Sequence, residues 1–87
     1  MTKPSLWFLA VALTAATAAP AFADRAPTPE ELWRIERSLA RAGYAAWEAI
    51  ELDDGRWAVD GAVGQDGRPY DVRLDPVTLR IVAAEPL

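Results

Sequence analysis

The alternation of apolar and polar positions is clearest in residues 47–63, which we predict form a β-hairpin. Two runs with a period of two flank Asp54-Gly55, a pair that accepts the positive φ angles of a two-residue turn. A turn there aligns three cross-strand pairs: Asp53 with Arg56, Leu52 with Trp57, and Ile50 with Val59. The apolar members of these pairs share one face, and the other face carries Glu51, Ala58 and Asp60. The turn and the apolar pattern therefore predict the same register.

A helix is predicted over residues 29–42, where the apolar period changes from two to between three and four. Thr28 is a good N-cap, Pro29 suits the first helical position, and Glu31 completes a capping box. One apolar stripe results, made of Leu32, Ile35, Leu39 and Ala42. Gly43 supplies the left-handed residue that ends a helix.

Two more turns extend the hairpin into a larger sheet. The first is Asp66-Gly67, and pairing outward from it sets Val63 opposite Tyr70, Gly61 opposite Val72, Val59 opposite Leu74, and Asp60 opposite Arg73. The second turn spans residues 75–78 and carries Pro76 at its second position. A fourth strand is then expected over residues 79–84, with Leu79 and Ile81 on the apolar face.

These elements predict an α+β fold, with one helix packed on a four-stranded antiparallel β-meander in the order α-β-β-β-β. The helix stripe and the apolar sheet face each need a cover, and packing them together supplies both.

The N-terminus has the layout of a signal peptide. Lys3 precedes an apolar stretch over residues 6–19, and Ala21-Phe22-Ala23 is a cleavage site of small residues. We therefore divide the chain into a signal peptide, residues 1–23, and a mature domain, residues 24–87, which is periplasmic or secreted. An uncleaved anchor is the alternative; after cleavage no stable membrane insertion is expected.

Composition narrows the class of partner. The chain contains no cysteine and no histidine, and its one lysine, Lys3, leaves with the signal peptide. The mature domain then holds eight arginines against 13 acids, a net charge of −5. Nucleic acid is not an expected partner, because phosphate binding needs a basic footprint. A monomer is expected.

No residues suggest a reaction. Ser38 is the one serine of the mature domain, and no histidine or lysine is present to act as its base. Asp53 and Asp54 are adjacent but lie at a turn tip. Neither the Asp54-Gly55 turn nor the Asp66-Gly67 turn has the residue spacing of a calcium-binding loop. We therefore expect no enzyme, no catalytic residues, no metal and no cofactor.

The candidate partner-binding residues are on the helix. Arg34, Arg37 and Arg41 gather on the side away from the apolar stripe, with Trp33 at the edge of that stripe. Tryptophan and arginine are the residue types most enriched at binding hot spots. The alternative is a solvated helix face, in which Glu30 pairs with Arg34 and Trp33 closes over the margin of the core.

The mature domain resembles a PepSY domain. The resemblance covers residues 28–84 and rests on four segments: Ala42-Gly43-Tyr44, the hairpin strands 50–59, the turn Asp66-Gly67-Arg68, and residues 70–78. One departure is Leu79, where the family usually has glycine after D-P-x-T. Because leucine would be strained at a positive φ, we expect a last turn of different shape.

PepSY domains occur in the propeptides of thermolysin-type metalloproteases, so the resemblance implies a role in regulating a peptidase. We therefore expect an exported binding module that modulates or inhibits a peptidase in the periplasm. The alternative is a protein-interaction module of the cell envelope that inhibits nothing. In both cases the partner is a protein.

Overall fold

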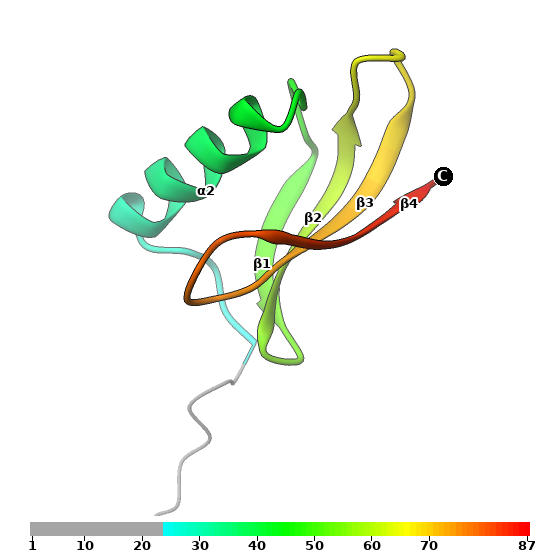
Figure 1. The fold of residues 1–87 in the computed structure, drawn as a ribbon. Coiled ribbons are helices and arrows are strands. Elements are labelled where there is room, and N and C mark those ends of the chain that lie inside the picture. The colour runs from blue at the N-terminus through cyan, green and yellow to red at the C-terminus, as the bar shows by residue number, and fades with distance from the viewer. Residues whose placement is uncertain (1–23) are drawn as a thin grey trace, which may run out of the picture.

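The computed structural model describes residues 24–87, so the signal peptide predicted for residues 1–23 lies outside the described residues. Within these described residues, one helix precedes four strands: α2 (Pro29–Arg41), β1 (Ala49–Asp53), β2 (Arg56–Val63), β3 (Pro69–Leu74) and β4 (Ile81–Pro86). The strands form one antiparallel sheet in the order β1-β2-β3-β4, and α2 lies across one of its faces (Figure 1). The predicted α+β meander is confirmed.

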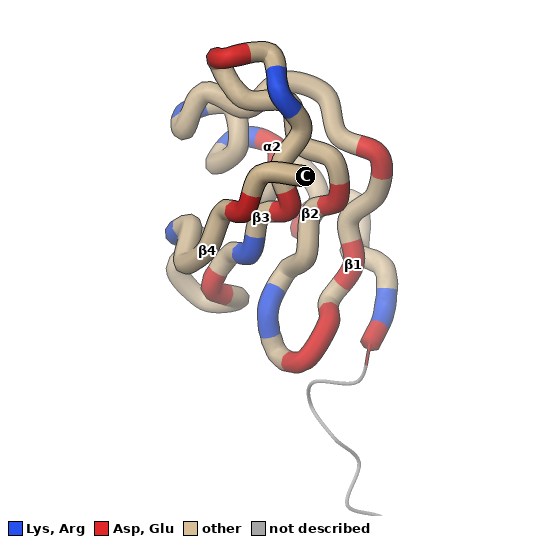
Figure 2. Tube along the Cα trace, turned by 90° about the vertical axis from the view of Figure 1, so that its right-hand side faces the viewer, with Lys and Arg blue, Asp and Glu red and all other residues tan. Residues whose placement is uncertain are grey.

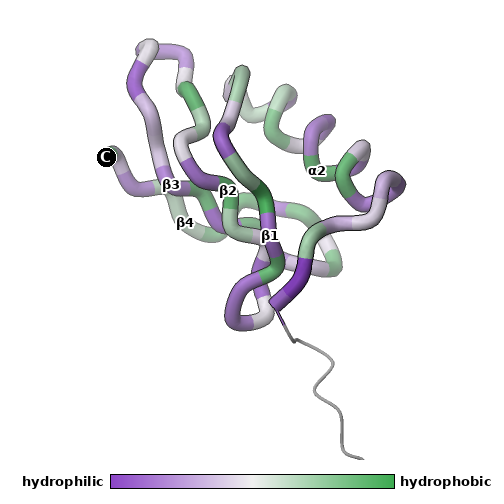
Figure 3. The backbone as a smooth tube through the Cα atoms, turned by 180° about the vertical axis from the view of Figure 1, so that it is seen from behind, coloured by the Kyte–Doolittle hydropathy of each residue, from purple (hydrophilic) through white to green (hydrophobic). Residues whose placement is uncertain are grey.

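The signals at both ends of α2 act as predicted. The Glu31 backbone N–H donates to the Thr28 hydroxyl at 3.2 Å, and the Thr28 N–H donates to the Glu31 carboxylate at 2.9 Å. The helix ends at Arg41, one residue before the predicted end, and Gly43 has a φ of 92°. Hydrophobic and hydrophilic positions alternate along α2 as an amphipathic helix requires (Figure 3).

The core lies between α2 and the sheet. Ile35 and Leu39 of α2 are fully buried. The buried sheet residues that complete this cluster are Leu52, Trp57, Val59, Ala62, Val72 and Leu74. Trp57 is 3% exposed, whereas Trp47 is partly buried at the cluster's edge, so both tryptophans pack on the core.

The first hairpin has the predicted register. Leu52 pairs with Trp57, and Ile50 pairs with Val59. Asp54 and Gly55 take φ values of 54° and 78°, the two positive angles of a type I′ turn.

The predicted register of β2 against β3 is wrong. The observed pairs are Trp57 with Leu74, Ala58 with Arg73, Val59 with Val72, Ala62 with Tyr70, and Val63 with Pro69. A β-bulge between Val59 and Ala62 inserts one extra residue into β2, with Gly61 at a φ of 67°. The bulge brings Ala62 rather than Val63 to the buried face.

The loop between β2 and β3 is also longer than a two-residue turn. It is closed by the Gly64 N–H, which donates to the Arg68 carbonyl at 2.9 Å. The Arg68 N–H and the Tyr70 hydroxyl both donate to the Asp66 carboxylate, and these bonds lower the pKa of Asp66, the Tyr70 bond most. Arg73 therefore lies opposite Ala58, and the predicted pairing of Asp60 with Arg73 does not form.

The fourth strand starts later than predicted, at Ile81 rather than Leu79. Leu79 instead belongs to the turn: its N–H donates to the Asp75 carbonyl, and the Asp75 N–H donates to the Arg80 carbonyl, both at 2.9 Å. The side chains of Leu79 and Ile81 still pack against the core, as the pattern predicts.

An N-terminal clasp, formed by Arg25, Glu31 and Trp57, joins the leader to the helix and the first hairpin. The backbone of Arg25 exchanges hydrogen bonds with Leu52 of β1, at 3.3 and 2.7 Å. The guanidinium of Arg25 binds both carboxylate oxygens of Glu31, at 2.7 and 2.9 Å. It also lies 5.3 Å from the centre of the Trp57 ring, within the range of a cation–π contact.

We predict that Trp57→Ala unfolds the domain. Truncating a buried tryptophan costs about 3–5 kcal/mol, and a domain this small rarely has more than about 3–5 kcal/mol of stability. Thermal unfolding followed by circular dichroism checks this. Trp33→Ala is the matched control and should melt near wild type, because Trp33 is 57% exposed. A cooperative wild-type melt for Trp57→Ala would contradict the packing described here.

We also predict that the clasp makes stability depend on acid pH. The hydrogen bonds from Arg25, and then that from the Thr28 N–H, lower the pKa of Glu31 from an ordinary 4.5 to about 2. A carboxyl whose pKa is lowered by folding stabilises the folded state above its unfolded pKa. That contribution is lost as the pH falls from about 4.5 through about 2.

Glu31→Gln removes the charge while leaving an oxygen for the Thr28 N–H. Urea unfolding at pH 7 and pH 3 should therefore show a smaller loss for Glu31→Gln than for wild type. Some loss should remain, because Asp66 and Asp75 also have lowered pKa values. Glu30→Gln, outside the clasp, should behave as wild type; identical acid profiles for all three proteins would contradict the prediction.

Candidate functional site

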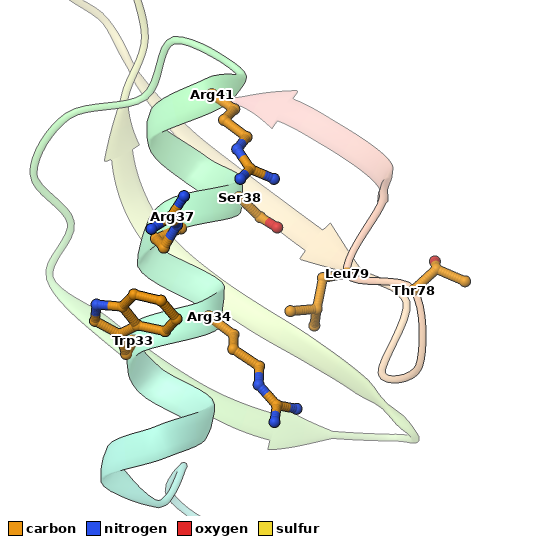
Figure 4. A pocket seen from close by; sticks show the side chains of 7 residues that line it. All are labelled: Trp33, Arg34, Arg37, Ser38, Arg41, Thr78 and Leu79. Atoms are coloured by element: carbon orange, nitrogen blue, oxygen red, sulfur yellow. The ribbon is translucent and has the colours of Figure 1, made fainter.

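The four helix residues selected from the sequence line one groove between α2 and the β3–β4 turn. The groove has a volume of about 410 Å³. Its lining residues are Trp33, Arg34, Arg37, Ser38, Arg41, Thr78 and Leu79 (Figure 4). The helical spacing places the first five on adjacent turns of α2, and the last two belong to the turn that faces them.

Trp33 and Arg37 form a stack on the outer side of the groove. The Arg37 guanidinium lies 4.8 Å from the centre of the Trp33 ring, a cation–π geometry. Trp33 is 57% exposed, so the alternative in which it closes over the core margin is wrong. An exposed indole held in place by an arginine is a preformed contact for a partner, since little side-chain freedom remains to be lost on binding.

The three arginines differ in their ion pairs. Arg34 pairs with Glu30 at 3.5 Å, and both side chains are exposed, so the solvated pair of the alternative interpretation is present. Between residues 24 and 87, the ion pairs within 4.0 Å involve Arg25 and Arg34 alone. Arg37 and Arg41 therefore present their charges to the groove without a carboxylate beside them.

The opposite wall is a turn with an unusual backbone. The Asp75 carboxylate accepts the N–H groups of Thr78 and Val77, at 2.9 and 2.8 Å, and these bonds lower its pKa. Leu79 then takes a φ of 60°. The turn therefore holds a leucine at positive φ, contrary to the expectation that its shape would change to avoid this. Its side chain points toward α2 (Figure 4).

The groove continues along α2 into a second hollow of about 350 Å³. That hollow is lined by Ser38, Arg41, Ala42, Leu79, Arg80 and Ile81. Together the two hollows are lined by four arginines and by no acid. By contrast, acidic positions are spread over the strands and their turns (Figure 2).

The uncharged polar side chains that line the groove are those of Ser38 and Thr78. Ser38 lies in it, but the sequence has no histidine or cysteine to pair with it. No group of three or more potential metal ligands occurs among residues 24–87. In the same part of the chain, no helix has the length and apolar character to cross a membrane.

Sequence reasoning missed the second wall of this site. Thr78 and Leu79 are nearly forty positions from Arg41, and only the fold brings them beside α2. The one available signal was the leucine itself, an apolar residue at a turn position that favours glycine.

The family model of the peptidase propeptide and YPEB domain matches residues 7–85, which include all of α2 and both walls of the groove. Comparison with curated proteins gave no significant match, and neither did comparison with solved structures.

We predict that glycine at position 79 gives a more stable domain than alanine. Both substitutions lose the partly buried leucine side chain, but only alanine keeps a Cβ at a φ of 60°. Leu79→Gly should therefore exceed Leu79→Ala in stability by about 1 kcal/mol. Urea unfolding of the two variants measures the difference. An alanine variant as stable as the glycine variant would mean that the turn is not strained.

Proposed function

The chain belongs to the family of peptidase propeptide and YPEB domains, or PepSY family, and from that premise we propose that it is an exported module that binds a peptidase and modulates its rate. Members of this family act as propeptide-type or inhibitor-type modules rather than as catalysts. The proposal places the protein in the periplasm or outside the cell, in agreement with the signal peptide predicted for residues 1–23.

The observation that carries the proposal is the exposed stack of Trp33 and Arg37 on the rim of a basic groove. An exposed tryptophan in a small domain usually still buries part of its surface against the core. Here the core is already filled by Trp57 and its neighbours. Trp33 lies outside that core cluster, and its ring stacks with Arg37 instead. Trp33, Arg34, Arg37 and Arg41 together are the proposed partner-binding residues.

If a peptidase binds through this groove, its rate of hydrolysis should change in proportion to the amount of the exported protein added, up to one equivalent. The test uses peptidases from the secreted and periplasmic fractions of the host, separated by chromatography and assayed on fluorescent casein. One equivalent of the exported protein should change the rate of at least one fraction and then saturate. Mass spectrometry after the assay must show the protein intact, because a protein that is being digested also slows casein hydrolysis.

A matched pair of variants links the effect to the groove. Arg37→Glu with Arg41→Glu should abolish the rate change, while Arg56→Glu with Arg68→Glu makes the same change of charge elsewhere on exposed positions and should preserve it. If no fraction changes rate, the peptidase proposal fails. Binding to an envelope protein without any rate change would instead support the non-inhibitory interaction module.

A further inference from the structure

The charge of the groove is opposite to that of the domain around it. Residues 24–87 carry a net charge of −5, yet the groove is lined by Arg34, Arg37, Arg41 and Arg80 with no acidic residue. Within the described residues, Arg37 and Arg41 have no carboxylate within 4.0 Å. A concave site of one sign concentrates the field on its occupant, so the chemistry it favours is anionic.

The spacing of the arginines defines the form of that anion. Arg37 and Arg41 are four residues apart on α2, a separation of about 6 Å along the helix axis. In an extended chain, side chains two residues apart lie on the same side and are separated by about 6.6 Å. Two carboxylates at positions i and i+2 of an extended segment therefore match the two arginines.

The opposite wall of the groove favours an apolar side chain in the bound segment. In the same extended segment, the side chain at i+1 points away from the carboxylates and so toward the β3–β4 turn. Leu79 projects from that turn into both hollows of the groove. Leu79 has a strained φ of 60°, and backbone strain of this kind concentrates at binding sites.

We infer that the groove binds an extended acidic segment of the protein partner, with the pattern acidic–apolar–acidic. The carboxylates pair with Arg37 and Arg41, and the apolar side chain between them packs on Leu79. The inference rests on the proposed function for the location of the site, and it adds the chemistry of the segment that fills it.

A protein segment fits the groove better than a lipid surface does. The groove runs between two walls, whereas the strands and turns elsewhere in the domain carry many acidic positions (Figure 2). The repulsion of a domain with a net charge of −5 acts against a whole surface more than against one short segment.

Fluorescence anisotropy with a labelled peptide of core Asp-Leu-Asp flanked by glycines tests the inference. It should bind about tenfold more tightly than the Asn-Leu-Asn peptide, because charge-assisted pairs with arginine are lost in the second. Binding should weaken steeply between low and high salt, since the pairs are solvent-exposed. The isomer Asp-Asp-Leu has the same charge without the spacing and should bind more weakly than Asp-Leu-Asp.

The variants decide whether the groove is responsible. Arg37→Glu with Arg41→Glu should reduce the affinity for Asp-Leu-Asp about tenfold, whereas Arg56→Glu with Arg68→Glu should leave it unchanged. Circular dichroism confirms that both double variants fold. Should the first fail to fold, the comparison of Asp-Leu-Asp with Lys-Leu-Lys on the wild-type protein still decides the question of charge.

Four results would overturn the inference: no binding of the Asp-Leu-Asp peptide, equal affinity for the Asp and Asn peptides, equal loss in both double variants, or tighter binding to phosphatidylglycerol vesicles than to the peptide. None depends on a peptidase. If the Asp-Leu-Asp peptide binds but no peptidase responds, the proposed function fails and the inference stands. If a peptidase responds but the peptide does not bind, the inference fails and the proposed function stands.

Discussion

The structure depends on the burial of one helix stripe against one sheet face. No disulfide can support this contact, because the chain has no cysteine, and residues 24–87 form too short a chain to build a second core. Ile35 and Leu39 are therefore fully buried, and the orientation of α2 about its own axis is fixed by them. The N-terminal clasp reinforces the contact at one end, because Arg25 joins β1, Glu31 of α2 and Trp57 of β2.

The binding surface follows from this orientation. Once the stripe faces the sheet, the remaining sides of α2 must carry Trp33 and the arginines into solvent. The β3–β4 turn lies beside α2 because β4 continues the meander, and Leu79 completes the groove from that side. A leucine at a positive φ has an energetic cost, which burial of its side chain against the core offsets in part.

The sequence was sufficient for features set by neighbouring residues. The capping box of Thr28 and Glu31, the left-handed Gly43 and the Asp54-Gly55 turn each depend on a few adjacent positions, and each was predicted. The register of β2 against β3 was not, because the longer loop shifts the pairs next to it by one residue and the bulge at Gly61 shifts the pairs beyond it by one more. A glycine inside a strand can indicate a bulge, but alternation over residues 59–63 gave an equally regular pattern without one.

Features that join distant parts of the chain were also beyond the sequence. The pairing of Arg25 with Leu52 and the approach of Leu79 to Arg41 depend on the assembled sheet. The candidate site was therefore half predicted: the residues on α2 were identified from their types and spacing, and the opposite wall was not. The same limit explains why Trp33 could be read either as core or as surface before its exposure was known.

The most direct test of the account is to map the bound surface by NMR. In a titration of the ¹⁵N-labelled protein with the Asp-Leu-Asp peptide, the amide shifts should concentrate in α2 from Trp33 to Arg41 and in residues 78–81. The rival surface is the open face of the sheet, where Arg56 and Arg73 lie near one another. Shifts confined to that face, with α2 unaffected, would contradict the central claim that the groove beside α2 is the binding surface.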